Sequence, residues 1–161
     1  MRRASFEDMS CSIARSLEVI GEWWTLLIIR DAFFGVTRFE DFQERLGVAR
    51  NILTKRLDTL VDAGVMERRV YDERRDRADY VLTRMGRDLW PVLVTMRQWG
   101  DRWITGRGKE PVALLHTACG ARTTAHLACD RCGERLNPRE VRAVAGPGHD
   151  ADDLVNNKRE R

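Results

Sequence analysis

The sequence predicts a mainly helical α+β fold with one small β-hairpin, followed by a separate cysteine-rich module. Three observations lead to this prediction. Apolar residues recur every three or four positions through residues 12–63 and 84–107, which is typical of amphipathic helices. Two stretches rich in β-branched and aromatic residues, 65–71 and 80–83, flank a polar turn. Three of the four cysteines lie within residues 119–132.

The composition is that of a protein with one main domain and an appendage. Hydrophobic residues make up 43% of the 161 residues, which is enough for a core. Because no apolar run reaches the length of a membrane span and the N-terminus has no run of signal-peptide type, we expect a cytoplasmic protein without membrane contact. The net charge is only +3, so the local placement of arginine indicates nucleic-acid binding better than the total charge does.

Changes in composition divide the chain into three predicted parts. Residues 1–107 hold the helices and the hairpin, and the stretch 106–111, which contains Gly and Pro, is typical of a linker. Residues 108–143 form the cysteine-rich module. Residues 144–161 are rich in Gly, Asp and Asn, and we expect this tail to be disordered.

A helix, a tight turn, a second helix and a hairpin follow one another in residues 38–83. Residues 39–46 have the apolar spacing of a helix, and Gly47 suits the turn after it. The second helix is predicted over 49–63 and ends at Gly64, since a helix C-terminus often needs a residue that tolerates positive φ. These are the parts of a winged helix-turn-helix, which places its second helix in the major groove of DNA.

The second helix has an apolar and a polar face at about 100° of rotation per residue. The polar face suits a groove, because Arg and Lys donate to guanine and Asn pairs with adenine. Arg50 and Arg56 flank the boundary between the faces. An ordinary solvated face without DNA contact is the alternative. The predicted inward residues are Ala49, Leu53, Leu57 and Leu60, and the outward ones are Asn51, Thr54, Lys55 and Asp58.

The hairpin strengthens the DNA-binding interpretation because its predicted tip is rich in arginine. Arg74, Arg75 and Arg77 occupy a position from which a wing contacts phosphates or enters a minor groove. The acidic residues interspersed with them, which dilute this charge, are Asp72, Glu73 and Asp76.

Two helices are predicted before this segment. Residues 11–20 form a short helix with Ile13, Leu17 and Ile20 inward, and residues 23–34 form an apolar core helix. The two tryptophans that begin the second of these helices either pack in the core and at a dimer interface or line an effector pocket.

Residues 84–107 are predicted to form the last helix of the main domain. Its apolar stripe, widened by Val92 and Trp99, exceeds what one small domain needs, and we interpret it as a dimerisation surface. Packing against the same chain is the alternative. A dimer would also be needed to read two half-sites about one DNA turn apart. The stripe consists of Leu89, Leu93, Met96, Gly100 and Trp103.

Cys11 to Gly100 resembles the HxlR-type transcriptional regulators, a branch of the MarR-like winged-helix proteins. The matching pieces are Cys11, Gly21-Glu-Trp-Trp-Thr-Leu-Leu-Ile-Ile-Arg30, Arg38-Phe39, Ile52-Leu-Thr-Lys-Arg-Leu57, Leu60-x-x-x-Gly64, Tyr80-x-Leu-Thr83, Gly86 and Trp99-Gly100. Family wings often carry proline near the tip, where this chain has charged residues instead.

The resemblance implies a homodimeric bacterial repressor or activator that binds a near-palindromic operator in double-stranded DNA and responds to a small molecule or a redox signal. Some members keep a single sensing thiol at the position of Cys11, although an inert residue at a dimer interface fits equally. The implied DNA-binding residues are Arg38, Arg50, Asn51, Thr54, Lys55, Arg56, Arg74, Arg75 and Arg77.

The cysteine-rich module repeats one pattern, in which two potential metal ligands are separated by two residues and followed by glycine. The halves are His116-Thr-Ala-Cys119-Gly120 and Cys129-Asp-Arg-Cys132-Gly133. One imidazole and three thiolates suit tetrahedral Zn²⁺, so we predict a structural, zinc-ribbon-like site. His126 is a rival fourth ligand. A disulfide between Cys129 and Cys132, or thiols without metal, are the alternatives.

These observations favour a zinc-supported DNA-binding regulator. Two other functions use the cysteine module: a thiol-redox protein, or an adaptor whose ribbon binds a partner while the winged domain dimerises. The redox enzyme lacks the strand–helix context of a thioredoxin-type site. No catalytic triad, paired-carboxylate site or phosphate loop is recognisable, and we predict that the protein is not an enzyme.

Overall fold

The computed structural model describes residues 5–6 and 9–148. The chain divides into two compact units, Met1–Leu93 and Val94–Arg161. Their boundary lies inside one helix. The predicted division after residue 107, into a DNA-binding domain and a cysteine-rich module, stays a prediction. The predicted disordered tail, 144–161, lies outside the described residues from position 149 onward.

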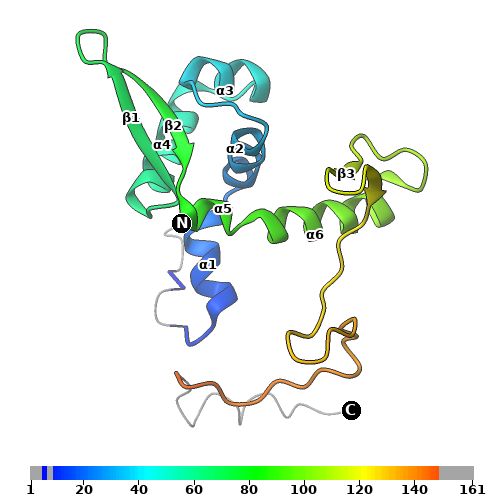
Figure 1. The fold of residues 1–161 in the computed structure, drawn as a ribbon. Helices are drawn as coiled ribbons and strands as arrows, with labels where there is room; N and C mark the ends of the chain where they lie inside the picture. The colour runs from blue at the N-terminus through cyan, green and yellow to red at the C-terminus, as the bar shows by residue number, and fades with distance from the viewer. Residues whose placement is uncertain (1–4, 7–8, 149–161) are drawn as a thin grey trace. The chain divides into compact units, whose positions relative to one another are not determined.

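The first unit is built from short helices and one hairpin (Figure 1). It contains α1 (Ser12–Ile20), α2 (Trp23–Phe33), α3 (Phe39–Leu46), α4 (Arg50–Asp62), β1 (Met66–Asp72), β2 (Arg77–Leu82) and α5 (Arg84–Arg87). The boundary helix α6 (Trp90–Gly100) leads into the π-helical turn η1 (Asp101–Thr105), and the second unit adds β3 (Leu114–His116) and β4 (Ala121–Thr123). No helix in the described ranges has the length and apolarity that crossing a bilayer requires.

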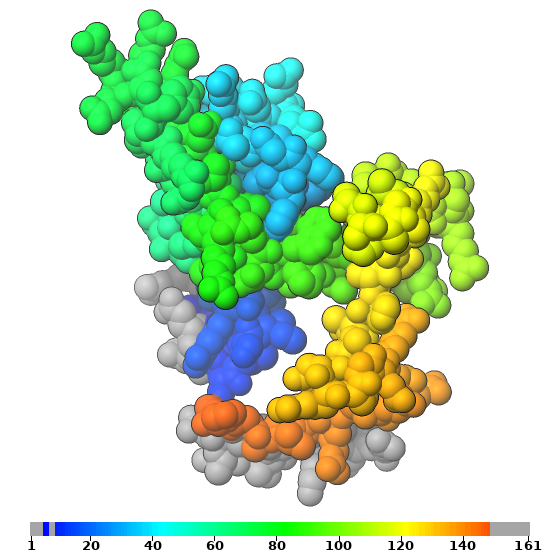
Figure 2. Space-filling model, in the orientation of Figure 1, coloured from blue at the N-terminus to red at the C-terminus, as the bar shows by residue number. Residues whose placement is uncertain are grey.

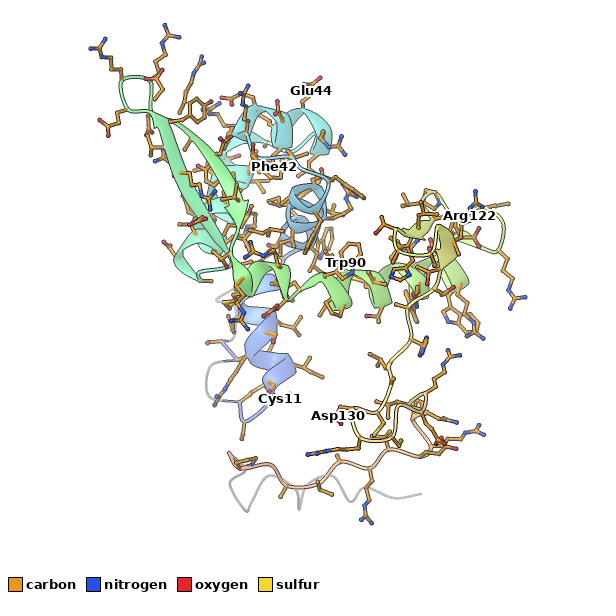
Figure 3. All side chains as sticks on the ribbon, in the orientation of Figure 1. Cys11, Phe42, Glu44, Trp90, Arg122 and Asp130 are labelled. Atoms are coloured by element: carbon orange, nitrogen blue, oxygen red, sulfur yellow. The ribbon has the colours of Figure 1, made fainter. Side chains whose placement is uncertain are left out.

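The core of the first unit lies between α2, α3, α4 and the base of the hairpin. Phe42, at the centre of α3, is fully buried and is marked in Figure 3. Burying such side chains supplies about 1.5–3 kcal/mol each relative to leaving them exposed. The other buried members of this cluster are Ile28, Ile29, Val48, Leu53, Leu57, Leu60, Val65 and Met66.

The predicted inward face of the second helix is confirmed except at its first residue. Leu53, Leu57 and Leu60 are fully buried. The predicted assignment of Ala49 to the core is wrong, because that residue is the extended N-cap of α4 and is exposed. Val48, one position earlier, fills the core instead.

The N-terminal helices form where expected, but parts of their apolar surface point outward. The prediction that Ile13 and Leu17 face inward is wrong, since Ile13 is 73% exposed and only Ala14 is buried among the residues of α1. Trp23, at the start of α2, is 89% exposed. The helices have the apolar spacing that the sequence predicts, but no surface of the described chain covers these side chains.

The predicted last helix is interrupted. Residues 84–107 form α5, α6 and η1 in succession rather than one helix. Pro91 accounts for the break, because it has no N–H to donate to the carbonyl of Arg87 and so cannot continue α5 into α6.

Two glycines in left-handed conformation delimit the helix-turn-helix. Gly47 (φ 62°) ends α3, and its N–H donates to the Gln43 carbonyl at 2.9 Å. Gly64 (φ 73°) ends α4 in a Schellman motif, in which the N–H of Val65 bonds to the carbonyl of Leu60 at 2.9 Å. The motif turns the chain sharply from α4 into β1.

The hairpin is antiparallel, with Met66 opposite Leu82 at its base. A bulge between Val70 and Asp72 shifts the register near the tip. The paired strands extend beyond α3 and α4 as a projecting wing (Figures 1 and 2). A bulge at this position increases the local twist and re-aims the tip.

The base of the wing is joined to α5 by a tight corner. The Thr83 hydroxyl donates to the Gly64 carbonyl at 2.6 Å and accepts the N–H of Gly86 at 3.2 Å, which caps α5. A Cβ atom placed on Gly86 would lie 2.2 Å from the Val65 carbonyl oxygen. Only glycine therefore lets α5 approach the backbone this closely.

We predict that Gly86→Ala lowers the free energy of unfolding by about 1–3 kcal/mol, the usual cost of overpacking. Gly146→Ala is the matched control, because nothing lies within 4 Å of a Cβ atom at that position. Urea denaturation followed by circular dichroism measures both. Equal midpoints for the two variants and the wild type would contradict this explanation of the corner.

Candidate nucleic-acid interface

The outward face of α4 forms a shallow depression that is open to solvent. Its charge changes along the helix: cations lie near the N-terminus, and the acidic residues follow in the last turns. The partial positive charge of a helix N-terminus adds to the cationic end. An anionic ligand is therefore favoured at the first two turns of α4. The depression is lined by Arg50, Asn51, Thr54, Lys55, Asp58, Thr59 and Asp62.

Side chains in the first turn of α4 are held by neighbours that leave them accessible. The guanidinium carbon of Arg50 lies 4.7 Å from the centroid of the Phe39 ring, a cation–π contact across the helix-turn-helix. The Asn51 side-chain oxygen accepts the N–H of Ile52 at 3.0 Å. Thr54 donates its hydroxyl to the Arg50 carbonyl at 3.0 Å. All three polar residues remain exposed.

Arg56 does not join this set. Its side chain is only 14% exposed, and Nη1 lies 3.8 Å from Oε1 of Glu22, the residue before α2. Its position on the boundary between the two helix faces explains why it turns toward the protein. Arg56 thus links α4 to the start of α2 in this structure, whereas its neighbour Lys55 lines the outward depression.

The tip of the wing is organised by two aspartates. One side-chain oxygen of Asp72 accepts the backbone N–H groups of Arg74 and Arg75, at 3.1 and 3.2 Å. Asp76 adopts a left-handed conformation (φ 49°), and its carboxylate accepts a hydrogen bond from Arg68. Two of the three acidic side chains that dilute the charge of the tip, Asp72 and Asp76, are therefore engaged within the hairpin.

The arginines of the hairpin fall into two groups. Hydrogen bonding to Asp76 raises the pKa of Arg68, and Arg69 is paired with Glu67. Within the described ranges, no ion pair engages the three arginines at or beside the tip, and all three are exposed. The three are Arg74, Arg75 and Arg77. Their side chains are therefore available to contact a phosphate backbone.

A short backbone pairing that the sequence did not reveal joins the wing to α3. The Thr37 hydroxyl donates to the Asp79 carboxylate at 2.8 Å, and the Thr37 carbonyl accepts the N–H of Tyr80 at 2.7 Å. Arg38 bridges to Asp79 through the backbone, and its guanidinium lies 5.9 Å from the Tyr71 ring centroid. The β-branched pair Val36-Thr37 was the only sequence signal for this pairing.

The predicted metal ligands lie in two tight turns of the second unit. His116 Nδ1 and Cys119 Sγ are 3.3 Å apart. Hydrogen bonds from the backbone N–H groups of Cys132 and Arg131 lower the pKa of the Cys129 thiol. The structure brings these ligands together in pairs; no group of three or more converges among the residues described. The four cysteines are not in disulfides.

Similarity to known proteins agrees with this interface. Residues 19–107 match the model of the HxlR-like helix-turn-helix family. The HTH-type transcriptional regulator Rv3095 of Mycobacterium tuberculosis, itself uncharacterised, is 42% identical over 140 residues, which are 87% of this chain and 89% of the relative.

Two solved structures extend the comparison. The crystal structure of PA1607, a candidate transcription factor, superposes with a TM-score of 0.78 at 37% identity and covers 89% of this chain and 100% of its own. The redox regulator HypR, in its reduced form, gives a TM-score of 0.50 at 30% identity over 56% of this chain and 93% of its own.

The family match, the extensive similarity to Rv3095 and the winged helix-turn-helix with an accessible cationic α4 lead to one conclusion. This chain belongs to the HxlR-like helix-turn-helix family of transcriptional regulators.

Proposed function

We propose that the protein is a dimeric, sequence-specific DNA-binding repressor that reads a near-palindromic operator. The observation that carries this proposal is the separation of paired from unpaired cations. Arg56, Arg68 and Arg69 each pair with a carboxylate of the same chain. The cations on the first turns of α4 and at the wing tip are exposed, as a surface that contacts phosphates requires.

The two parts of the surface take different roles in the proposal. The N-terminal turns of α4 enter the major groove, where Arg50 and Asn51 read base edges. The three arginines of the wing tip contact phosphates of the flanking DNA backbone. Asp58 and Asp62 line the same depression nearer the helix C-terminus. In the proposal this end of α4 stays outside the groove, since phosphates would repel the carboxylates.

A second copy of the chain is the proposed partner of α6. Met96 is 57% exposed and lies in a stripe of exposed apolar residues at helical spacing. On another side of the helix, the side-chain amide of Gln98 exchanges two hydrogen bonds with the backbone of Ala125, at 2.8 and 2.9 Å. The rest of this exposed stripe consists of Val92, Trp99 and Trp103.

Dimerisation accounts for the exposed stripe and fits the near-palindromic operator that we propose. Two α4 helices related by a twofold axis can occupy successive major grooves, which matches two inverted half-sites. The proposed action is repression, because a dimer bound at a promoter excludes polymerase from the same DNA. A promoter–reporter assay with and without the regulator tests the direction of control.

Substitutions should separate base reading from phosphate binding. Asn51→Ala and Arg50→Ala should each reduce the preference for operator over scrambled duplex by about 1–3 kcal/mol, the value of a bidentate base contact. Arg75→Ala should weaken binding to both duplexes alike and lower the salt dependence by about one phosphate contact. Gel-shift titrations at several salt concentrations measure both effects.

Arg69→Ala is the matched control for the wing, because its guanidinium is already paired with Glu67. It should weaken DNA binding less than Arg75→Ala does. Equal losses of affinity for both duplexes in all four variants would refute the division into base-contacting and phosphate-contacting residues.

The dimer interface is tested by placing a charge in the apolar stripe. We predict that Met96→Asp converts the protein from twice the 18.6 kDa chain mass to a single chain in light scattering. Operator affinity should fall on the order of a hundredfold, since linked half-site binding is lost. Leu115→Asp adds the same charge at a similarly exposed residue of β3 and should leave the mass unchanged.

A wild-type protein that is already a single chain would contradict the dimer. So would a Met96→Asp variant that keeps the dimeric mass.

The proposal includes control by a redox signal or a small molecule. The similarity to HypR, a redox regulator, supports the redox alternative. Cys11, a free and partly exposed thiol immediately before α1, is the candidate sensor. DNA release by a mild oxidant from the wild type but not from Cys11→Ser would assign the signal to this thiol. Release from neither protein would favour a small-molecule signal.

A further inference from the structure

The described part of the second unit after η1 has no hydrophobic core. Among the described residues from 107 to 148, not one is buried, and Leu114 and Cys129 are the only partly buried ones. The strands β3 and β4 pair over only three residues each. A segment that buries so little apolar surface needs another source of stability. In small modules a bound metal is a common one.

A tight turn at the end of β3 holds the first pair of predicted ligands, His116 and Cys119. The N–H groups of Cys119 and Gly120 both donate to the His116 carbonyl, at 3.2 and 2.8 Å. Gly120 has φ of 70°, which a residue with a side chain rarely adopts. This turn sets the imidazole beside the thiol, with Nδ1 and Sγ 3.3 Å apart. Arg122, marked in Figure 3, lies just beyond it in β4.

The second half repeats the same backbone turn. The N–H of Gly133 donates to the Cys129 carbonyl at 2.8 Å, and Gly133 has φ of 75°. The Cys129 N–H in turn donates to the Glu134 carbonyl at 2.8 Å, which folds the chain back on itself. Figure 3 marks Asp130 within this turn. The two halves thus share the glycine conformation, the closing hydrogen bond and the ligand spacing.

We propose that these two turns close on a single Zn²⁺ ion, bound by His116, Cys119, Cys129 and Cys132. Three thiolates and one imidazole satisfy the tetrahedral preference of zinc, and all four positions come from the protein, so the ion is structural. On binding, each of the three thiols releases one proton and the imidazole binds through a neutral nitrogen. No oxidant or reductant takes part.

The connection between the turns permits this closure. Nine residues, 120–128, join them. At about 3.3 Å per extended residue they span more than the width of one metal site, so the two pairs can meet at one ion. Leu136 and Leu127 are hydrogen-bonded through their backbones at 2.9 Å, which shapes the chain flanking the second turn.

The site is also fastened to the helix that we propose as the dimer interface. Ala125, in the connection between the turns, is held by Gln98 of α6, and the Val112 carbonyl accepts a hydrogen bond from Arg97. The zinc module therefore rests on α6. The metal site itself does not depend on DNA binding, so its test can fail or succeed independently of the proposed function.

The test is the metal content of the full chain, purified without added zinc and dialysed, by inductively coupled plasma mass spectrometry. We expect about one zinc per chain. Cys132→Ser and His116→Ala should weaken zinc binding at least about tenfold, as measured by competition with a chromogenic chelator. Cys11→Ser and His126→Ala are the controls and should keep the full zinc content.

Cobalt substitution gives a second readout that does not depend on the variants folding. Apo protein titrated with Co²⁺ should show tetrahedral d–d bands and thiolate charge-transfer bands that saturate at one ion per chain. Wild-type protein that neither copurifies with zinc nor gives these bands would overturn the site. Loss of zinc in His126→Ala but not in His116→Ala would overturn the proposed ligand set.

Discussion

The pairing of Thr37 with β2, midway along the wing, is the constraint on which the proposed DNA-facing surface depends. Two short hydrogen bonds, from the Thr37 hydroxyl to Asp79 and from the Tyr80 N–H to the Thr37 carbonyl, join the residues before α3 to β2. Because α3 leads directly through Gly47 into α4, this junction sets the wing relative to the recognition helix. A wing hinged only at its base would cost conformational entropy each time it met DNA.

Ion pairs and hydrogen bonds within the chain decide which charges the wing tip and the outward face of α4 expose. The wing sequence alternates basic and acidic residues, so its net charge alone is a poor guide. Asp72 accepts backbone N–H groups, and Asp76 accepts a hydrogen bond from Arg68, which leaves Glu73 as the acidic side chain at the tip. The exposed charge of the tip is therefore more positive than a count of its residues suggests. Arg56, which pairs with Glu22, is likewise not part of the outward cationic face of α4.

Local sequence patterns predicted most helices and the hairpin, whereas they could not predict contacts between residues far apart in the sequence. Gly47 and Gly64 marked both ends of the helix-turn-helix correctly, because the positive φ that each adopts is a local requirement. The Thr37–Asp79 bond joins residues far apart in sequence and left no periodic signal. Ile13 and Trp23 have core-like spacing but are exposed, since periodicity identifies an apolar face without identifying what covers it. The two ligand turns were predicted from spacing, and their union at one ion stays a prediction.

The central claim is that two copies of α4 read successive major grooves. Selection of bound duplexes from a random pool, followed by hydroxyl-radical footprinting of the winners, tests it most directly. The account predicts an inverted repeat whose half-sites are centred about 10 base pairs apart, with flanking backbone protected by the wings. Enrichment of no sequence, or of a single unrepeated site, would contradict it.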